Sequence, residues 1–95
     1  MNSCFIVGHI EKMPQDPRCD NENGYMMQIR CTRPYAEPNG VFLDDVFPVE
    51  LWRGIAADTC SICRTGDPIA IKGRLIIRQG MSVIIAEHVS LPNQF

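Results

Sequence analysis

The sequence predicts an all-β fold, a five-stranded barrel with one short helix between the third and fourth strands. Short runs of alternating apolar and polar residues recur along the chain, and turn-forming residues separate them. The 95 residues suffice for one domain, and a hydrophobic content of 45% is typical of globular proteins. We expect this domain over residues 1–91 and a short C-terminal tail over residues 92–95.

Each strand is expected where an alternating run lies between clusters of Gly, Pro, Asn or Asp. The expected strands cover residues 3–10, 25–32, 46–53, 68–78 and 81–89. Between the first two strands, residues 13–24 are rich in turn formers and predict a loop. Residues 33–45 contain two prolines and predict a long connection. Gln79 and Gly80 predict a tight hairpin turn between the last two strands.

The third strand has a buried and an exposed face. Because side chains alternate along a strand, Val49 and Leu51 are expected inside while Glu50 and Trp52 face outward. Pro48 cannot donate a ladder hydrogen bond, which indicates an edge or a bulge at that position.

The fourth strand has one apolar and one basic face. The residues expected inside are Ile69, Ile71 and Leu75, and those expected outside are Lys72, Arg74 and Arg78. A glycine within this strand, Gly73, fits a sharply bent barrel strand.

The only helix is expected over residues 54–64, with Gly66 as its C-terminal stop. Its apolar stripe consists of Ile55, Ala56, Thr59, Cys60, Ile62 and Cys63. Five strands with one helix after the third is the element order of the OB-fold barrel.

Three segments resemble the bacterial single-stranded DNA-binding protein family. They are Phe5-Ile6-Val7-Gly8-His9-Ile10, then Val49-x-Leu51-Trp52 before a helix, and Gly66-Asp67-x-Ile69-x-Ile71-x-Gly73-x-Leu75. The resemblance covers residues 2 to about 91. It implies an OB-fold, binding of single-stranded DNA without sequence reading, and a homo-oligomer, a dimer or tetramer, paired partly through the first strand. It also implies that Trp52 is the stacking aromatic of the third strand.

The chain departs from this family in two places. The family's long hairpin between strands four and five is reduced here to Gln79 and Gly80. Its acidic C-terminal tail, which recruits replication-protein partners, has no counterpart in residues 91–95. We therefore do not expect this chain to recruit such partners.

Single-strand binding requires aromatic rings for the bases and cations for the phosphates. We expect Trp52 to stack, with Tyr35 as a second ring and Phe42 as a weaker candidate. The expected phosphate contacts are Arg30, Arg53, Lys72, Arg74 and Arg78. The alternatives are that Trp52 lies under the 33–45 connection or in a subunit interface, and that the cations form an ordinary solvated face. Glu50 shares the face of Trp52 and is expected to repel phosphate.

The net charge of −2 argues against a general polyanion binder, although most acidic residues fall in expected loops and leave a locally basic sheet face. No Gly-rich phosphate loop or catalytic constellation is present, so we expect a non-enzyme without cofactor or metal. Cys60 and Cys63 are spaced for a redox or zinc site, but no second short pair exists, and small buried hydrophobes are the favoured role. No apolar run reaches membrane-spanning length, and five irregularly spaced cysteines favour the cytoplasm.

The functional hypothesis is sequence-independent binding of single-stranded DNA by base stacking and phosphate contacts, in support of DNA replication, recombination or transfer. The alternative is a protein-interaction OB-fold, a primosomal-type accessory or a subunit of a larger assembly, with little affinity for nucleic acid.

Overall fold

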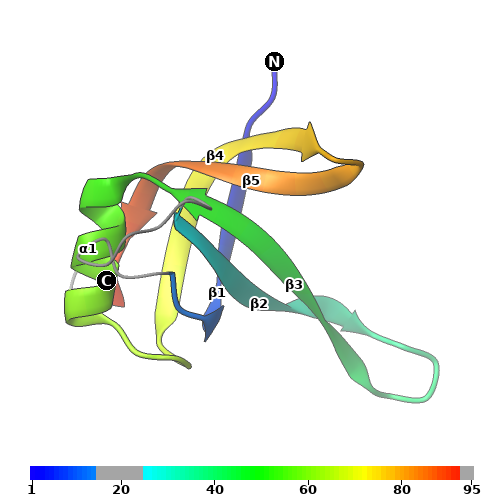
Figure 1. Cartoon of the computed structure of the whole chain (residues 1–95). Helices are drawn as coiled ribbons and strands as arrows, with labels where there is room; N and C mark the ends of the chain where they lie inside the picture. Colours follow the sequence, from blue (N-terminus) through cyan, green and yellow to red (C-terminus); the bar gives the residue numbers. More distant parts are fainter. Residues whose placement is uncertain (15–24, 93–95) are drawn as a thin grey trace.

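A computed structural model describes residues 1–14 and 25–92 of the chain and confirms the predicted fold class. The strands form a closed barrel in the order β1-β2-β3-β5-β4, with the helix between β3 and β4 in sequence (Figure 1). The elements are β1 (Cys4–Lys12), β2 (Tyr25–Ala36), β3 (Phe42–Leu51), α1 (Arg53–Ile62), β4 (Pro68–Arg78) and β5 (Met81–Ser90). This is the OB-fold architecture.

The core fills the barrel with the inward-facing residues of all five strands. Its most deeply buried side chains are Ile10, Met27, Ile29, Val49, Ile69 and Ile71. Helix α1 adds Ala56, Thr59 and Cys63 to this core. Thr59 is buried without penalty because its hydroxyl donates to the carbonyl of Ile55 at 2.7 Å.

Helix α1 ends earlier than predicted. The helix ends at Ile62, and the N–H of the next residue, Cys63, donates to the Thr59 carbonyl at 2.8 Å. Gly66 lies in the turn that follows and is not the residue that stops the helix. Ile62 was expected in the apolar stripe, but its side chain is 46% exposed, because the buried stripe runs through Ala56, Thr59 and Cys63 and leaves Ile62 at its margin. No helix within the described residues is long and apolar enough to cross a membrane. The predicted loop at residues 13–24 lies outside the described residues from residue 15 onward.

The prediction of a long connection over residues 33–45 is wrong. Strand β2 continues to Ala36 and β3 begins at Phe42, so this part of the chain is a strand hairpin that projects from the barrel (Figure 1). A short turn closes it, where the N–H of Glu37 donates to the Val41 carbonyl at 2.8 Å. We call residues 31–46 the β2–β3 arm.

Cross-strand polar pairs explain why the arm forms strands without an apolar alternation. The guanidinium of Arg33 donates to both carboxylate oxygens of Asp45, at 2.9 and 3.0 Å. The hydroxyl of Thr32 donates to the carboxylate of Asp44 at 2.5 Å. Such pairs stabilise two-stranded pairing even where neither face is buried.

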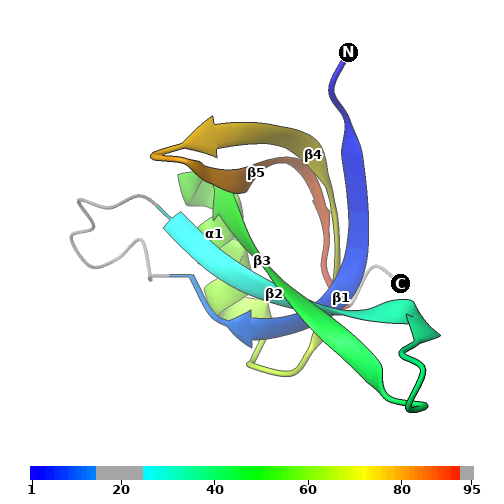
Figure 2. The same ribbon diagram turned by 90° about the vertical axis from the view of Figure 1, so that its right-hand side faces the viewer.

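A β-bulge interrupts the β4–β5 ladder, where Lys72 pairs with His88 and Gly73 with Ala86, so that Glu87 of β5 is the extra residue. Beyond it, the second half of the hairpin runs across the barrel (Figure 2). Gly73 is required at the bend, because a Cβ atom there would lie 2.1 Å from the backbone oxygen of Ile85. Leu75, predicted to be buried, keeps the parity of Ile69 and Ile71 but is 44% exposed, because it lies in the outer half of the hairpin, where Ile77 and Met81 are also exposed.

The predicted tight turn at Gln79 and Gly80 is confirmed. Arg78 pairs with Met81 across it, and the two turn residues have φ angles of 52° and 78°. Two consecutive positive φ angles define a type I′ turn.

The barrel closes through a short parallel contact between β3 and β5. Within the described strands, these two pair only through Val49 with Ile84 and Glu50 with Ile85. Pro48 immediately precedes this contact, and the β2–β3 register runs through it without a bulge. The predicted edge at Pro48 therefore corresponds to the end of the β3–β5 pairing.

Candidate nucleic-acid interface

Trp52 lies on the outside of the barrel, at the junction of β3 and α1. Its extended backbone, with φ −87° and ψ 161°, continues the strand by one residue, so its side chain keeps the outward parity of Glu50. Its carbonyl accepts the first helical hydrogen bond, from the N–H of Ala56 at 2.9 Å. The indole is 46% exposed. The alternative in which the 33–45 connection covers Trp52 is therefore wrong.

The orientation of the indole is set by its neighbour in the helix. A Cβ atom added to Gly54 would lie 3.6 Å from both Cδ1 and Nε1 of Trp52, an ordinary contact distance. The pyrrole edge of the ring thus rests beside the first turn of α1. The first turn holds one edge of the indole and leaves nearly half of the residue open to a stacking partner.

Trp52 belongs to a continuous surface formed by the outward residues of β2 and β3. Met26 pairs with Glu50, and Arg30 pairs with Val46, across the same ladder. We call this surface the β2–β3 outer face. It consists of Met26, Gln28, Arg30, Val46, Pro48, Glu50 and Trp52.

The negative charge of Glu50 on this face is compensated by Arg78. The Arg78 guanidinium, from the end of β4, donates to both carboxylate oxygens of Glu50, at 2.9 and 3.3 Å. This hydrogen-bonded pairing raises the pKa of Arg78 above its usual value. The expected repulsion of phosphate by Glu50 is therefore offset, but Arg78 is also no longer an uncompensated cation.

Two further arginines border the same face. Arg30 lies 3.8 Å from the carboxylate of Glu11, with both side chains more than 40% exposed, so the pair is weak. Arg53 was predicted on a strand but is the first residue of α1. Its guanidinium donates to the hydroxyl of Tyr25 at 3.4 Å, a long hydrogen bond.

The two remaining predicted cations lie on β4. Arg74 pairs with Ile85, which in turn pairs with Glu50, so it lies two strands from the outer face of β3. Lys72 pairs with Phe5 and His88, on the side of the barrel formed by β1, β4 and β5. The structure thus gathers Trp52, Arg30, Arg53 and Arg78 around one face and separates Lys72 from them.

The second predicted ring, Tyr35, lies on the β2–β3 arm and is 61% exposed, and Phe42 opposite Ala36 is 55% exposed. The charges of the arm are Arg33 against Glu37, Asp44 and Asp45, so the arm is acidic. The hydrogen bonds from Arg33 lower the pKa of Asp45, which keeps this carboxylate charged. The exposed rings of the arm are therefore surrounded by groups that disfavour phosphate.

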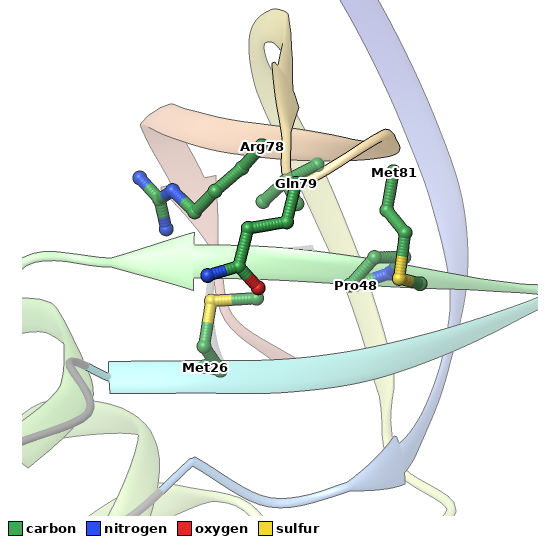
Figure 3. A pocket seen from close by; sticks show the side chains of 6 residues that line it. Met26, Pro48, Arg78, Gln79 and Met81 are labelled. Atoms are coloured by element: carbon green, nitrogen blue, oxygen red, sulfur yellow. The ribbon is translucent and has the colours of Figure 1, made fainter.

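A cavity of about 440 Å³ lies between the tip of the β4–β5 hairpin and the β2–β3 outer face (Figure 3). Its lining consists of Met26, Pro48, Arg78, Gln79, Met81 and Val83. Sequence reasoning assigned only Arg78 to the site, because the cavity exists only once the bulge has bent the hairpin over the sheet. The one local signal was Gln79, an unusual residue for the first position of a type I′ turn.

Among the described cysteines, Cys31 and Cys63 lack the features of a reactive thiol. Cys63 is buried, and burial raises the pKa of its thiol, the opposite of what a nucleophilic thiol requires. Burial also raises the pKa of Cys31. The thiol of Cys60 lies 3.6 Å from the carbonyl oxygen of Pro14. Among residues 1–14 and 25–92, no group of His, Cys, Asp and Glu is arranged to hold a metal ion.

Fold and surface together define an OB-fold protein whose exposed Trp and basic residues share one barrel face. No protein-family model matches the sequence, and no curated protein matches it. Solved structures do match, and single-stranded DNA-binding proteins are among them. A small one from Streptomyces coelicolor is 25% identical, with a TM-score of 0.59, covering 96% of this chain and 94% of that one.

Two eukaryotic structures are similar at lower identity. The Plasmodium falciparum protein in complex with single-stranded DNA is 15% identical, with a TM-score of 0.72, covering 96% of this chain and 92% of that one. The mitochondrial protein of S. cerevisiae is 11% identical, with a TM-score of 0.68, covering 94% and 90%. The chain has the OB-fold architecture of single-stranded DNA-binding proteins, as the sequence resemblance predicted.

Proposed function

We propose that this protein binds single-stranded DNA without reading its sequence, in support of DNA replication, recombination or transfer. The observation that carries the proposal is Trp52, a half-exposed indole on the β2–β3 outer face. Trp is among the residues most buried on average, so an exposed ring favours a binding role. Stacking of a base on such a ring contributes about 1–3 kcal/mol and tolerates any base. The Plasmodium protein of similar fold was solved in complex with single-stranded DNA, which supports this ligand.

Phosphate contacts are assigned to the arginines around Trp52. Among the described residues, Arg30 and Arg53 have only weak or neutral partners, and Arg78 can exchange Glu50 for a phosphate. Because few cations are available, the affinity is expected to be modest and to fall with salt. No step of this binding requires catalysis or a cofactor, and a cytoplasmic location accords with it.

Titration with oligo-dT tests the proposal. Trp52 is the only tryptophan, so quenching of its fluorescence reports the proposed site directly. We expect strong quenching at low salt, with a log–log salt slope of about −0.7 for each phosphate neutralised. The absence of both quenching and a change in the anisotropy of a labelled oligonucleotide would exclude the proposal.

A pair of variants locates the site. Trp52→Ala should weaken oligonucleotide binding by at least about fivefold, the lower limit for one stacked base. Ile62→Ala is the matched control, because Ile62 is also 46% exposed but lies at the far end of α1. Equal binding by both variants would move the stacking site away from Trp52.

We also propose that the protein forms a homo-oligomer through β1. Phe5 and Val7 on the outside of this strand are 66% and 59% exposed, and β2 pairs with β1 only from His9 onward. Residues 4–7 thus offer both an apolar face and an unpaired strand edge to a second copy. Light scattering should give a dimer or tetramer, and Phe5→Glu should shift it to the monomer.

The β2–β3 arm favours a second candidate function, protein interaction. Its exposed apolar residues are Tyr35, Val41, Phe42, Leu43 and Val46, and they stand among carboxylates that disfavour DNA. If the protein fails the oligo-dT titration but binds another protein through the β2–β3 arm, protein interaction is its function instead.

A further inference from the structure

The cavity beneath the β4–β5 hairpin has a lining suited to a planar apolar group. Met26 from β2 lies at one side of it, below the Gln79 side chain, and Met81 from β5 lies at the other side, beside Pro48 of β3 (Figure 3). A volume of about 440 Å³ is within the range of protein sites that enclose small organic groups. Thioether side chains are flexible and polarizable, and they make favourable contacts with aromatic rings.

Gln79 supplies the polar group of the cavity. Its φ of 52° is left-handed, a conformation that Gly, Asn and Asp adopt at lower cost than Gln. The turn itself therefore gives no reason for a Gln at this position. The longer side chain does extend from the turn over the cavity towards Met26 (Figure 3).

The amide of Gln79 is both a donor and an acceptor. The edges of the nucleobases also carry donors and acceptors side by side, in an arrangement that differs from base to base. A base held between the two thioethers would present its edge to this amide. The cavity thus combines two kinds of contact. The thioethers can contact any base, whereas the Gln79 amide can distinguish among bases by their edges.

The cavity lies on the path of a strand stacked on Trp52. Pro48 and Trp52 share the outward parity of β3 and are four residues apart, about 13 Å along the strand. Arg78 lines the cavity and is anchored on Glu50, the outward residue between them. A single strand that contacts Trp52 and Arg78 therefore passes the mouth of the cavity.

We propose that this cavity is a base-binding pocket, which takes one unstacked base of the bound single strand between Met26 and Met81 with Gln79 at its edge. The proposal rests on the proposed function and adds to it a preference among bases. The strand is held by Trp52 and the arginines without regard to sequence, and the pocket makes some bases bind more tightly than others.

Gln79→Asn separates the role of the pocket from that of the turn. Asn keeps the amide and is favoured at this turn position, but it is one methylene shorter. We expect an unchanged or higher melting temperature and an affinity for single-stranded oligonucleotides lowered about two- to tenfold. Met81→Ala, at a residue 64% exposed, should weaken binding similarly with little loss of stability.

Ile77→Ala is the control, because Ile77 lies on the same hairpin, is 71% exposed and does not line the cavity. Anisotropy is measured for labelled dT, dC and dA oligonucleotides of equal length. The wild type and Ile77→Ala should rank the three bases identically, and Gln79→Asn and Met81→Ala should reduce the differences among them.

The outcomes distinguish this proposal from the one on which it rests. If the wild type binds oligonucleotides and quenches Trp52 while the two pocket variants bind all three as it does, the pocket is refuted and the proposed function stands. If Ile77→Ala weakens binding as much as the pocket variants, the effect belongs to the hairpin as a whole and the pocket is again refuted. If the wild type binds no oligonucleotide at low salt, both proposals fail.

Discussion

Gly73→Ala should destabilise this protein more than most single substitutions. The new Cβ atom would lie 2.1 Å from the Ile85 oxygen, 3.0 Å from the Ile85 carbonyl carbon and 3.2 Å from the Cα atom of Ala86. The first of these distances is more than 1 Å short of the 3.4 Å at which ordinary contact begins. All three atoms belong to the backbone, so no side-chain rotation relieves the clash. The β4–β5 ladder must open at the bulge.

The cost follows from these contacts. Overpacking of this kind costs about 1–3 kcal/mol, and one or two backbone hydrogen bonds lost from the ladder add about 0.5–1.5 kcal/mol each. A loss of about 2–5 kcal/mol is a large share of the roughly 5–14 kcal/mol expected for a domain of this length. The melting temperature, followed by circular dichroism, should fall by at least about 10 °C.

Gly54→Ala provides the contrast for this prediction. The same added methyl group would meet only Trp52 at 3.6 Å, and the position is helical, so stability should stay the same or rise by up to about 1 kcal/mol. A Gly73→Ala variant within about 0.5 kcal/mol of the wild type in urea unfolding would refute this account of the bulge, since surface substitutions stay within that margin.

The remaining predictions concern charge and thiols. Glu50→Gln removes the carboxylate that holds Arg78, so oligonucleotide affinity at low salt should rise and the log–log salt slope should steepen by about 0.7; an unchanged slope would mean that Arg78 contacts no phosphate. Burial raises the thiol pKa of Cys31 and Cys63, so both should react slowly with iodoacetamide at pH 7 and faster as the pH passes 9, and rapid labelling of Cys63 at pH 7 in peptide maps would contradict its burial. The pKa of Asp45 in the folded protein lies below the ordinary value of 3.8, because Arg33 donates hydrogen bonds to the carboxylate. The contribution of Asp45 to stability is therefore present above about pH 4 and is lost as the pH falls through the lower folded value. Asp45→Asn should therefore melt below the wild type at pH 7, and the difference should shrink below pH 3.8; a constant difference would assign the effect to something other than ionisation.

The parts of the fold that were predictable are those in which burial dictates the pattern. The fourth strand was placed over residues 68–78 and is Pro68–Arg78, because an apolar alternation there lies between turn residues. The β2–β3 arm was missed because cross-strand pairs such as Arg33 with Asp45 hold it together instead of apolar burial. Leu75 has the parity of a buried residue, but the sequence does not show that the outer half of its hairpin extends beyond the core.

The site was predictable only to the extent that it depends on a single strand. The outward position of Trp52 followed from parity along β3, and its extended backbone preserves that parity. The pairing of Arg78 with Glu50 joins residues 28 positions apart and depends on the curvature of the hairpin. Pairs of this kind, and the cavity above Met26, have no signature in a local pattern because they form only in three dimensions.

The β3–β5 contact that closes the barrel is the shortest of the described strand pairings, so we expect it to open most readily. With pairing confined to Val49 and Glu50 on β3, amide protons on both sides of this contact should exchange with solvent before those of the other ladders. A DNA strand that spans Trp52 and the β4–β5 hairpin would lie across the β3–β5 contact and oppose its opening. Binding would then be recorded as slowed exchange at Ile84 and Ile85, a protection footprint that appears even if no atom changes its average position.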